Sequence, residues 1–395
     1  MYYKYWLRAR NKLKNQIKYV SQRCPFDEFF HQIMLDCMVY VPTNSLVYYL
    51  WAEPLSDLEL MLDSLNYNSP NIFLFIPSNL SDNNFIIGQT SASYGVQQVI
   101  NVATKYPQTN FVLISDIAEL NREGTLVNNL KYVELNLLTI EKSRFQPLLP
   151  VIEKNFDSNQ HFLTLNNRAA PSRIALISYL LGNNLEQYGV ITVSQMITNQ
   201  VNQFDDYLDI INWHFNLTHT STIKPKLELG FQKLKKYKYI GDQTDNFQRV
   251  NISADNFENY IKPLYLNSFV EIVTETYYEE PSLLLTEKTL QCILGCNFPI
   301  IIGSYGSIDY MEKLGFDVFH DVIDHSYDKI ISPVDRLFAA IDLNYRILSD
   351  SKWAKDAWIR CQGRFLKNVE FSKKNMYTVT YNRVIDQFKA SCISK

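Results

Sequence analysis

The amino-acid sequence predicts an α/β protein with two Rossmann-like domains, each a parallel sheet covered by helices. Three stretches of the 395-residue chain carry this prediction, because in each of them short apolar runs alternate with segments of helical periodicity. These stretches are residues 40–150, 161–194 and 268–328. In open parallel sheets ligands bind beyond the carboxyl ends of the strands, so we expect functional residues in the polar loops that follow the apolar runs.

The first half of the chain alternates strand-like and helix-like segments over residues 40–150. Apolar runs rich in β-branched and aromatic residues favour strands, and helical runs near 55–65 and 95–105 lie between them. This alternation is typical of a doubly wound parallel sheet. The four strand candidates are Leu46–Trp51, Ile72–Ile76, Phe111–Ile114 and Tyr132–Leu135.

The predicted domain boundaries follow from changes in composition. The chain becomes polar over residues 150–160, which is typical of a linker, and residues 351–390 have a mostly helical pattern. A chain of 395 residues is long enough for two domains that each bury a full core. We therefore expect an N-terminal domain at 1–155, a C-terminal domain at 156–350 and a helical tail at 351–395 that packs across both.

A strand, a loop and a helix are expected over residues 161–194. Phe162–Leu165 is the strand candidate, and Pro171 suits the first turn of the helix that follows. Arg168 and Arg173 then lie at a strand end and a helix start, where guanidinium groups can bind phosphate oxygens through paired hydrogen bonds. The alternative is that both arginines are surface or helix-capping residues.

A helical run begins with an acid–base pair between the strand candidates Phe269–Val273 and Phe298–Ile302. Thr286 is the expected N-cap, and Glu287 and Lys288 lie in the first turn, where backbone N–H groups lack partners. A diphosphate at this place would meet amide donors and the Lys288 ammonium together, while Glu287 could accept hydrogen bonds from sugar hydroxyls. The alternative is an ordinary helix start with a solvated lysine.

A resemblance to a known family covers the same region. Residues 275–304 read ETYYEEPSLLLTEKTLQCILGCNFPIIIGS. This segment resembles the donor-binding segment of the alpha-1,3-fucosyltransferase family, and more closely that of a fucosyltransferase-like group in phages and cyanobacteria. Glu275 stands where the family pattern begins, the central Thr-Glu-Lys matches at 286–288, and Pro299 to Gly303 match its end.

The resemblance implies a glycosyltransferase of the GT-B architecture, in which two Rossmann-like domains face each other across a cleft. The donor would lie on the second domain and the acceptor on the first. By the same resemblance, Glu287 binds donor hydroxyls, Lys288 binds the diphosphate, and Arg173 corresponds to a phosphate-binding arginine. Thr276 stands in place of the family's Asn and Leu284 in place of its Tyr, so the guanine and fucose preference is not carried over.

The expected reaction transfers a sugar from a nucleotide diphosphate to an acceptor hydroxyl, without a metal and, by the resemblance, with inversion at the anomeric carbon. Cationic side chains would stabilise the charge on the leaving diphosphate. A carboxylate from the first domain would take the acceptor proton, and the candidates are Glu53 and Asp116, which follow strand candidates. The expected donor-site residues are Arg168, Arg173, Glu275, Thr286, Glu287, Lys288, Ser304 and Tyr305, of which the last two alternatively only form a turn.

Composition excludes several classes of function. The net charge of −3 argues against binding of polyanions by bulk charge. The six cysteines form no CxxC pair or metal-ligand spacing, which favours buried thiols, including Cys292 and Cys296, in a reducing cytoplasm. We expect no metal, no cofactor besides the nucleotide-sugar donor, no signal peptide and no membrane span.

Two basic stretches leave other partners open. Residues 1–23 carry seven basic and no acidic side chains, so a helix there could contact an anionic membrane or nucleic acid, or pack on its own domain. Residues 224–239 interleave six lysines with aromatic residues, a pattern that suits a nucleic-acid groove or a solvated helix face.

Three hypotheses for the function remain open, and the first two differ in the acceptor. A surface glycan or a lipopolysaccharide precursor is the default acceptor for a GT-B enzyme. The first alternative is a phage enzyme that glycosylates a hydroxymethylated base in duplex DNA, in the host cytoplasm. The second alternative is a catalytically inactive protein that binds a sugar nucleotide or a glycan.

Overall fold

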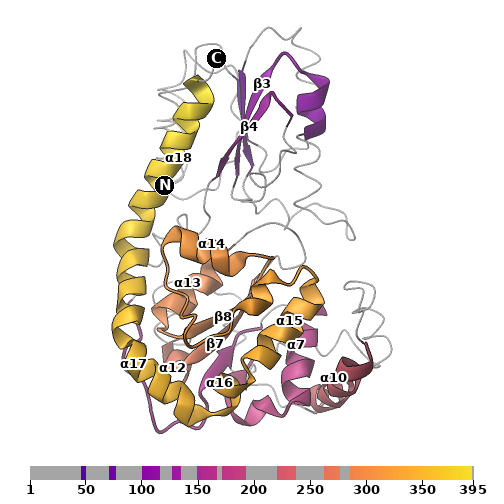
Figure 1. Ribbon diagram of the computed structural model, residues 1–395, viewed down its shortest axis with the longest axis vertical. Coiled ribbons are helices and arrows are strands. Elements are labelled where there is room, and N and C mark those ends of the chain that lie inside the picture. Colours follow the sequence, from indigo (N-terminus) through magenta and orange to yellow (C-terminus); the bar gives the residue numbers. More distant parts are fainter. Residues whose placement is uncertain are drawn as a thin grey trace. The chain divides into compact units, whose positions relative to one another are not determined.

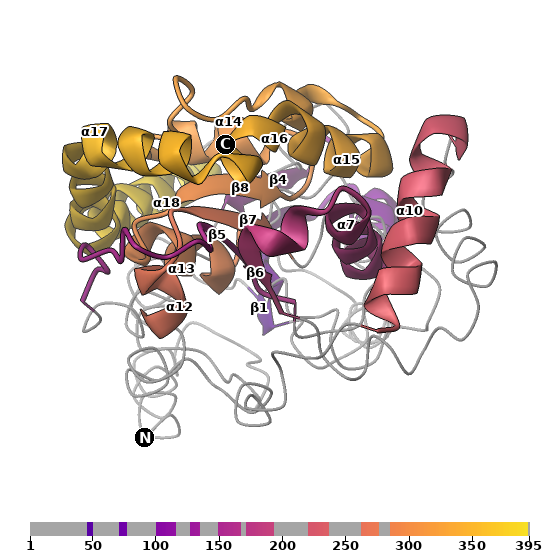
Figure 2. The same ribbon diagram turned by 90° about the horizontal axis from the view of Figure 1, so that it is seen from below.

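The protein has an α/β fold in the part of the chain that the structure describes. The computed structural model describes residues 46–49, 71–76, 100–115, 127–134, 149–166, 171–192, 220–236, 262–275 and 285–393. Within these residues lie two parallel sheets of four strands each, together with helices (Figures 1 and 2). The predicted fold class is therefore confirmed at the level of α/β with parallel sheets. None of the helices described is long and apolar enough to cross a membrane.

The chain divides into two compact units. Unit 1 combines Met1–Ser143 with Glu280–Leu284 and Asn375–Lys395, and unit 2 combines Arg144–Glu279 with Leu285–Lys374. The C-terminal helices are shared between the units, because α17 belongs to unit 2 and α18 to unit 1. These helices are α17 (Ser351–Glu370) and α18 (Met376–Ile393), joined by the π-helical segment Phe371–Asn375.

Unit 1 contains a parallel sheet in which the described strands follow one another in chain order. Each strand overlaps one of the apolar runs from which it was predicted. The side-chain nitrogen Nδ2 of Asn129 donates to the backbone oxygens of Ala103 (2.8 Å) and Thr109 (2.9 Å). These hydrogen bonds fix the backbone just before the strand that begins at Leu130. The helix α18 contacts that strand, and Lys131 Nζ lies 3.1 Å from the backbone oxygen of Ser391. The strands are β1 (Leu46–Tyr49), β2 (Asn71–Ile76), β3 (Asn110–Ser115) and β4 (Leu130–Glu134).

Unit 2 contains a parallel sheet with the strand order β6-β5-β7-β8. Every residue of these strands is buried, as expected for a parallel sheet with helices on both sides (Figure 2). The chain passes from β5 outward to β6 and from β7 outward to β8, so the winding direction reverses between β5 and β7. The strands are β5 (Phe162–Thr164), β6 (Gly189–Ile191), β7 (Val270–Thr274) and β8 (Phe298–Ile302).

Helices of unit 2 connect and cover these strands. The helix α7 joins β5 to β6, and α13 joins β7 to β8 and contacts both strands. The helix α15 contacts β8 and α7. The segments are α7 (Pro171–Gly182), η3 (Leu185–Gln187), α10 (Thr220–Leu234), α12 (Lys262–Leu266), α13 (Glu287–Leu294), α14 (Ser307–Leu314), η7 (Ser326–Lys329), α15 (Pro333–Leu343) and α16 (Tyr345–Ser349).

A buried lysine closes the amino edge of this sheet. The Nζ atom of Lys154 donates to the backbone oxygens of Tyr265 (2.8 Å), Ser268 (2.8 Å) and Gly295 (2.6 Å). Two of these oxygens belong to helix C-terminal regions, where partner-less carbonyls attract a cation. Burial of the ammonium lowers the pKa of Lys154 to about 7. The segment that was predicted as a linker is thus anchored to unit 2.

The helix α10 packs closely against α7, and it contains part of the basic stretch. A side chain at Gly230 would collide with the backbone oxygen of Ser178, so the two helix backbones lie in direct contact. Lys226 lies 3.7 Å from the carboxylate of Asp342, and Lys233 forms an ion pair of 2.6 Å with a glutamate of unit 2, Glu186. Two lysines of the basic stretch therefore hold α10 in place.

Candidate functional site

The carboxyl edge of the sheet in unit 2 contains a topological switch point between β5 and β7. Ligands of open α/β sheets bind at such a point, in the crevice outside the strand ends. Leu165 and Asn166 follow β5, and Glu275 follows β7. The first turn of α13 returns to the same edge, because α13 begins after the loop that leaves β7. The predicted helix start at Thr286 therefore belongs to the switch point.

The carboxylate of Glu275 is buried and binds the start of α13. Only 4% of this residue is exposed. Its Oε1 atom accepts hydrogen bonds from the backbone nitrogen of Thr286 (3.0 Å) and from the hydroxyl of Thr289, and its Oε2 atom accepts the hydroxyl of Thr286. A carboxylate at this position also interacts favourably with the positive end of the helix dipole. Glu275 was predicted to contact the donor, and the structure places it as a group that positions α13.

Thr286 is the N-cap of α13, as the sequence predicted. Its backbone is extended (φ −106°, ψ −175°), and its hydroxyl oxygen accepts from the backbone nitrogen of Lys288 at 3.5 Å. The helix itself begins at Glu287, of which the structure describes only the backbone. The predicted start of the helix is therefore confirmed to the residue.

The ammonium group of Lys288 lies over the first turn of α13. Its Nζ atom is 2.9 Å from the hydroxyl oxygen of Thr286 and 3.9 Å from Oε2 of Glu275, and 21% of its side chain is exposed. A cation this close to a helix N-terminus adds to the positive potential of the dipole there. The backbone nitrogens of Thr286 and Lys288 are already bound by Glu275 and by the hydroxyl of Thr286. The group of this helix start that is suited to an anion is therefore the ammonium of the partly exposed Lys288.

Two buried polar atoms at the switch point have no hydrogen-bond partner among the residues that the structure describes. They are Oδ1 of Asn166 and Oγ1 of Thr274. Asn166 is held in place, because its backbone nitrogen donates to Oγ1 of Thr192 (2.8 Å) and its Nδ2 atom donates to Oγ1 of Thr164 (3.1 Å). An unsatisfied buried polar atom costs about 1–3 kcal/mol, which a ligand that donates a hydrogen bond could offset. Neither residue was predicted as part of the site, although both stand at the end of an apolar run.

The other residues predicted for the site are more buried than Lys288, form a turn, or lie outside the described part of the chain. Arg173 lies in the first turn of α7 and is only 6% exposed, so Lys288 offers the more accessible positive charge. Ser304 is fully buried, and its backbone oxygen accepts from the nitrogen (3.1 Å) and hydroxyl (2.7 Å) of Ser307, which shapes the turn into α14. Tyr305, in the same turn, is 36% exposed. Glu53, Asp116, Arg168 and the basic residues 1–23 lie outside the described residues.

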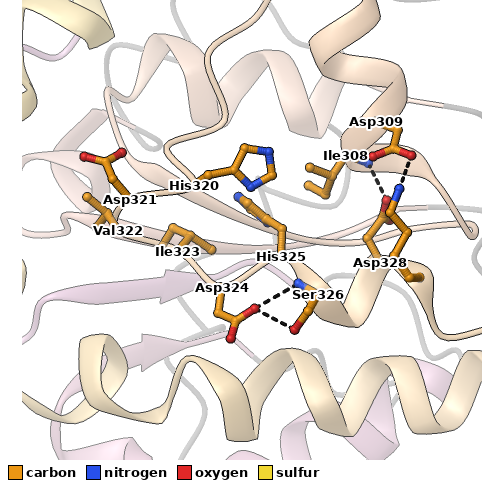
Figure 3. A pocket seen from close by; sticks show the side chains of 11 residues that line it. Ile308, Asp309, His320, Asp321, Val322, Ile323, Asp324, His325, Ser326 and Asp328 are labelled. Carbon is orange, nitrogen blue, oxygen red and sulfur yellow. Dashed lines mark hydrogen bonds and ion pairs between the residues drawn. The ribbon is translucent and has the colours of Figure 1, made fainter.

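A pocket of about 550 Å³ lies beside α14, in the segment that follows β8 (Figure 3). No role was predicted from the sequence for residues 308–329, which line this pocket. Asp328 lines the pocket, is 2% exposed and accepts a hydrogen bond from the backbone nitrogen of Ile308 (3.2 Å). Burial raises the pKa of Asp328 to about 6. The lining residues are Ile308, Asp309, His320, Asp321, Val322, Ile323, Asp324, His325, Ser326, Asp328 and Lys329.

A neutral histidine supports the wall of this pocket. The Nε2 atom of His325 lies 2.7 Å from the backbone oxygen of Val318, and a carbonyl can only accept, so Nε2 carries the proton. The Nδ1 atom lies 3.2 Å from the hydroxyl of Tyr327, whose oxygen in turn accepts from the nitrogen of Ile301 in the edge strand β8. Burial lowers the pKa of His325 to about 4, which keeps the imidazole neutral.

Comparison with protein-family models, with curated proteins and with solved structures finds no match for this chain. The resemblance to fucosyltransferases therefore stays a prediction from the sequence. Among the described residues, no group of three His, Cys, Asp or Glu side chains is arranged to hold a metal ion.

Proposed function

We propose that the chain is a glycosyltransferase that moves a sugar from a nucleotide-diphosphate donor to an acceptor hydroxyl. The observation that carries this proposal is the position of Lys288. Lys288 lies in the first turn of a helix, at the switch point of a parallel sheet, and 21% of its side chain is exposed. The resemblance of residues 275–304 to a donor-binding segment supports the same function and the two-domain GT-B architecture.

In this proposal the start of α13 binds the diphosphate of the donor. When the bond to the sugar breaks, negative charge develops on the diphosphate, and fixed donors stabilise that charge without having to reorganise. Lys288 supplies the positive charge for this purpose, and Glu275 and Thr286 hold the first turn of α13 in position. Glu287 is assigned to hydroxyls of the donor, and Arg173 is a supporting charge nearer the interior.

The acceptor would approach from the N-terminal domain. A carboxylate there accepts the proton of the attacking hydroxyl, and Glu53 and Asp116 are the proposed candidates. The reaction is proposed to proceed without a metal and with inversion. A surface glycan or a lipopolysaccharide precursor is the proposed acceptor.

The test is a panel of nucleotide sugars scored by release of free nucleoside diphosphate, with glycan and duplex DNA acceptors in separate arms. We expect one donor to be consumed, and Lys288→Ala to lower its turnover by about 100-fold or more, the usual effect of removing a group that stabilises transition-state charge. Lys352→Ala is the matched control, since Lys352 is an exposed lysine on α17 that pairs only with Asp356 among the described residues.

Three outcomes decide the proposal. Full turnover by a folded Lys288→Ala protein would remove Lys288 from the mechanism. Thermal stabilisation by a nucleotide sugar without release of nucleotide would identify a binding protein in place of an enzyme. Turnover only with hydroxymethylated DNA would keep the transferase and replace the acceptor.

A further inference from the structure

We propose that Asn166 and Thr274 form a subsite for a hydroxyl group of a sugar ring, at the switch point of the sheet in unit 2. This inference rests on the proposed function, because the ring belongs to the nucleotide-sugar donor, as its ribose or as the transferred sugar. It adds two neutral side chains that select hydroxyl groups to the cationic Lys288 that is proposed to bind the diphosphate.

The two side chains stand at the same level of neighbouring strands. Phe162 of β5 pairs with Val270 of β7, and Asn166 and Thr274 each follow four residues later. Since the side chains of a strand alternate between the two faces of a sheet, both point to the face that Phe162 and Val270 occupy. The hydrogen bond from Nδ2 of Asn166 to Oγ1 of Thr164 agrees with this direction. The two residues therefore form a pair on one face of the sheet.

This pair lies at the exit from the sheet, where ligands of open α/β sheets bind. Thr274 is the last residue of β7, and Asn166 lies two residues beyond the end of β5. The next residue after Thr274 is Glu275, which points to the opposite face and holds the start of α13 there. Crossover connections between parallel strands are right-handed, so the outward connections through α7 and α13 lie on opposite faces. A ligand in the crevice between β5 and β7 can thus be held from both faces.

Each side chain of the pair has a buried polar atom that the fold leaves unused. Asn166 is 0% exposed and Thr274 is 5% exposed, and within the described ranges neither Oδ1 of Asn166 nor Oγ1 of Thr274 has a hydrogen-bond partner. The backbone nitrogen and Nδ2 of Asn166 are held by Thr192 and Thr164, which fixes the direction of the amide. Unpaired buried polar atoms are costly, and at a ligand-binding edge a group of the ligand offsets this cost.

The chemistry of the pair selects a hydroxyl group. An amide oxygen only accepts hydrogen bonds, so Oδ1 of Asn166 attracts a donor and repels the oxygens of a phosphate. A threonine hydroxyl both donates and accepts. A sugar hydroxyl that donates to Oδ1 of Asn166 and accepts from Oγ1 of Thr274 satisfies both atoms. Because both side chains are neutral, they bind hydroxyl groups without competing with Lys288 for the diphosphate.

The test is isothermal titration of the full chain with three pairs of ligands: UDP and UDP-glucose, GDP and GDP-mannose, and ADP and ADP-glucose. The decisive variant is Thr274→Val, which removes the hydroxyl and keeps the shape of the side chain. We expect it to weaken the ligand that the wild type binds best by about three- to tenfold, the usual effect of losing one neutral hydrogen bond. Thr274→Ser, which keeps a hydroxyl, should bind nearly as the wild type does.

A second measurement separates binding from folding. A hydroxyl without an internal partner does not stabilise the fold, so the thermal midpoint of ligand-free Thr274→Val should equal or exceed that of the wild type. Ser178→Ala is the matched control, because the hydroxyl of Ser178 is also buried and unpaired among the described residues, but in the middle of α7. This variant should likewise keep the midpoint, and it should bind every ligand as the wild type does.

The pattern of losses identifies the ring. If Thr274→Val weakens both members of a ligand pair, the hydroxyl belongs to the ribose, and if it weakens the nucleotide sugar alone, the hydroxyl belongs to the transferred sugar. Equal affinity of wild type and Thr274→Val for a ligand that Lys288→Ala weakens would overturn this inference and leave the proposed function intact. A lower midpoint of Thr274→Val with unchanged affinity would show that the hydroxyl serves the fold. If the wild type binds none of these ligands, the proposed function and this inference both fall.

Discussion

At the scale of single residues, the start of α13 places a lysine where a helix alone disfavours one. A cation in the first turn faces the positive end of the helix dipole, at a cost of roughly 0.3–1 kcal/mol. The buried carboxylate of Glu275, 3.9 Å from Nζ of Lys288, offsets this cost and binds Thr286 at the same time. The lysine is thus supported from the interior, while part of its side chain remains accessible to an anion.

His325 makes the stability of the fold depend on pH. Its pKa is about 4 in the folded protein and about 6.5 in the unfolded chain, so the unfolded chain binds more protons between these values. Stability from this residue is complete above pH 6.5 and decreases as the pH falls toward 4. We expect the wild type to lose up to about 3 kcal/mol more than His325→Gln over this interval, measured by urea unfolding at a series of pH values.

The comparison with His325→Gln isolates this one residue. Asp328 changes stability in the opposite direction, because its pKa is raised to about 6 by burial, and this contribution is common to both proteins. Parallel stability curves for wild type and variant across this interval would show that His325 is protonated as easily in the folded protein as in the unfolded chain.

The residues of the candidate site differ in how far the sequence could predict them. Thr286 was predictable, because a threonine before a helical run is a local N-cap signal. The role of Glu275 was not, since its partner on α13 is 11 residues away and the direction of its carboxylate depends on the fold. Asn166 has no local signal at all, because its unsatisfied oxygen is a property of the packed interior.

At the scale of elements, the contact between α7 and α10 depends on glycine. A side chain at Gly230 would collide with the backbone oxygen of Ser178, so α10 would have to move away from α7. We expect Gly230→Ala to destabilise the protein by about 1–3 kcal/mol, although alanine is the better helix former. The measurement is the free energy of unfolding in urea.

Gly363→Ala is the matched control for this prediction. Gly363 lies in α17, and in the described part of the chain no atom beyond its chain neighbours and the local helix backbone lies within 4 Å of an added Cβ. This variant should gain up to about 1 kcal/mol from helix propensity alone. Equal effects of the two substitutions would mean that α7 and α10 do not touch through their backbones.

The elements themselves were largely predictable from local patterns. The runs Val270–Thr274 and Phe298–Ile302 are strands because continuous apolar residues suit a sheet that is buried on both faces. The role of the basic stretch at residues 224–239 could not be predicted from the sequence pattern, because two of its lysines meet Asp342 and Glu186 only in the folded protein. Long-range ion pairs of this kind leave no periodic signal in the sequence.

At the scale of the whole molecule, the two units differ in the winding of their sheets. The described strands of unit 1 follow chain order, whereas the order in unit 2 reverses between β5 and β7. A reversal of strand order creates the crevice in which open α/β sheets bind ligands. This difference supports the proposed assignment of the donor to the second domain.

The claim on which the proposed function depends is that the start of α13 binds a diphosphate. The most direct measurement is equilibrium binding of a panel of nucleoside diphosphates and the matching monophosphates to wild type, Lys288→Ala and Lys352→Ala. We expect at least one diphosphate to bind more tightly than its monophosphate, and only Lys288→Ala to weaken its binding, by about tenfold or more. Equal affinity of the wild type and Lys288→Ala for that diphosphate would show that Lys288 does not bind the diphosphate.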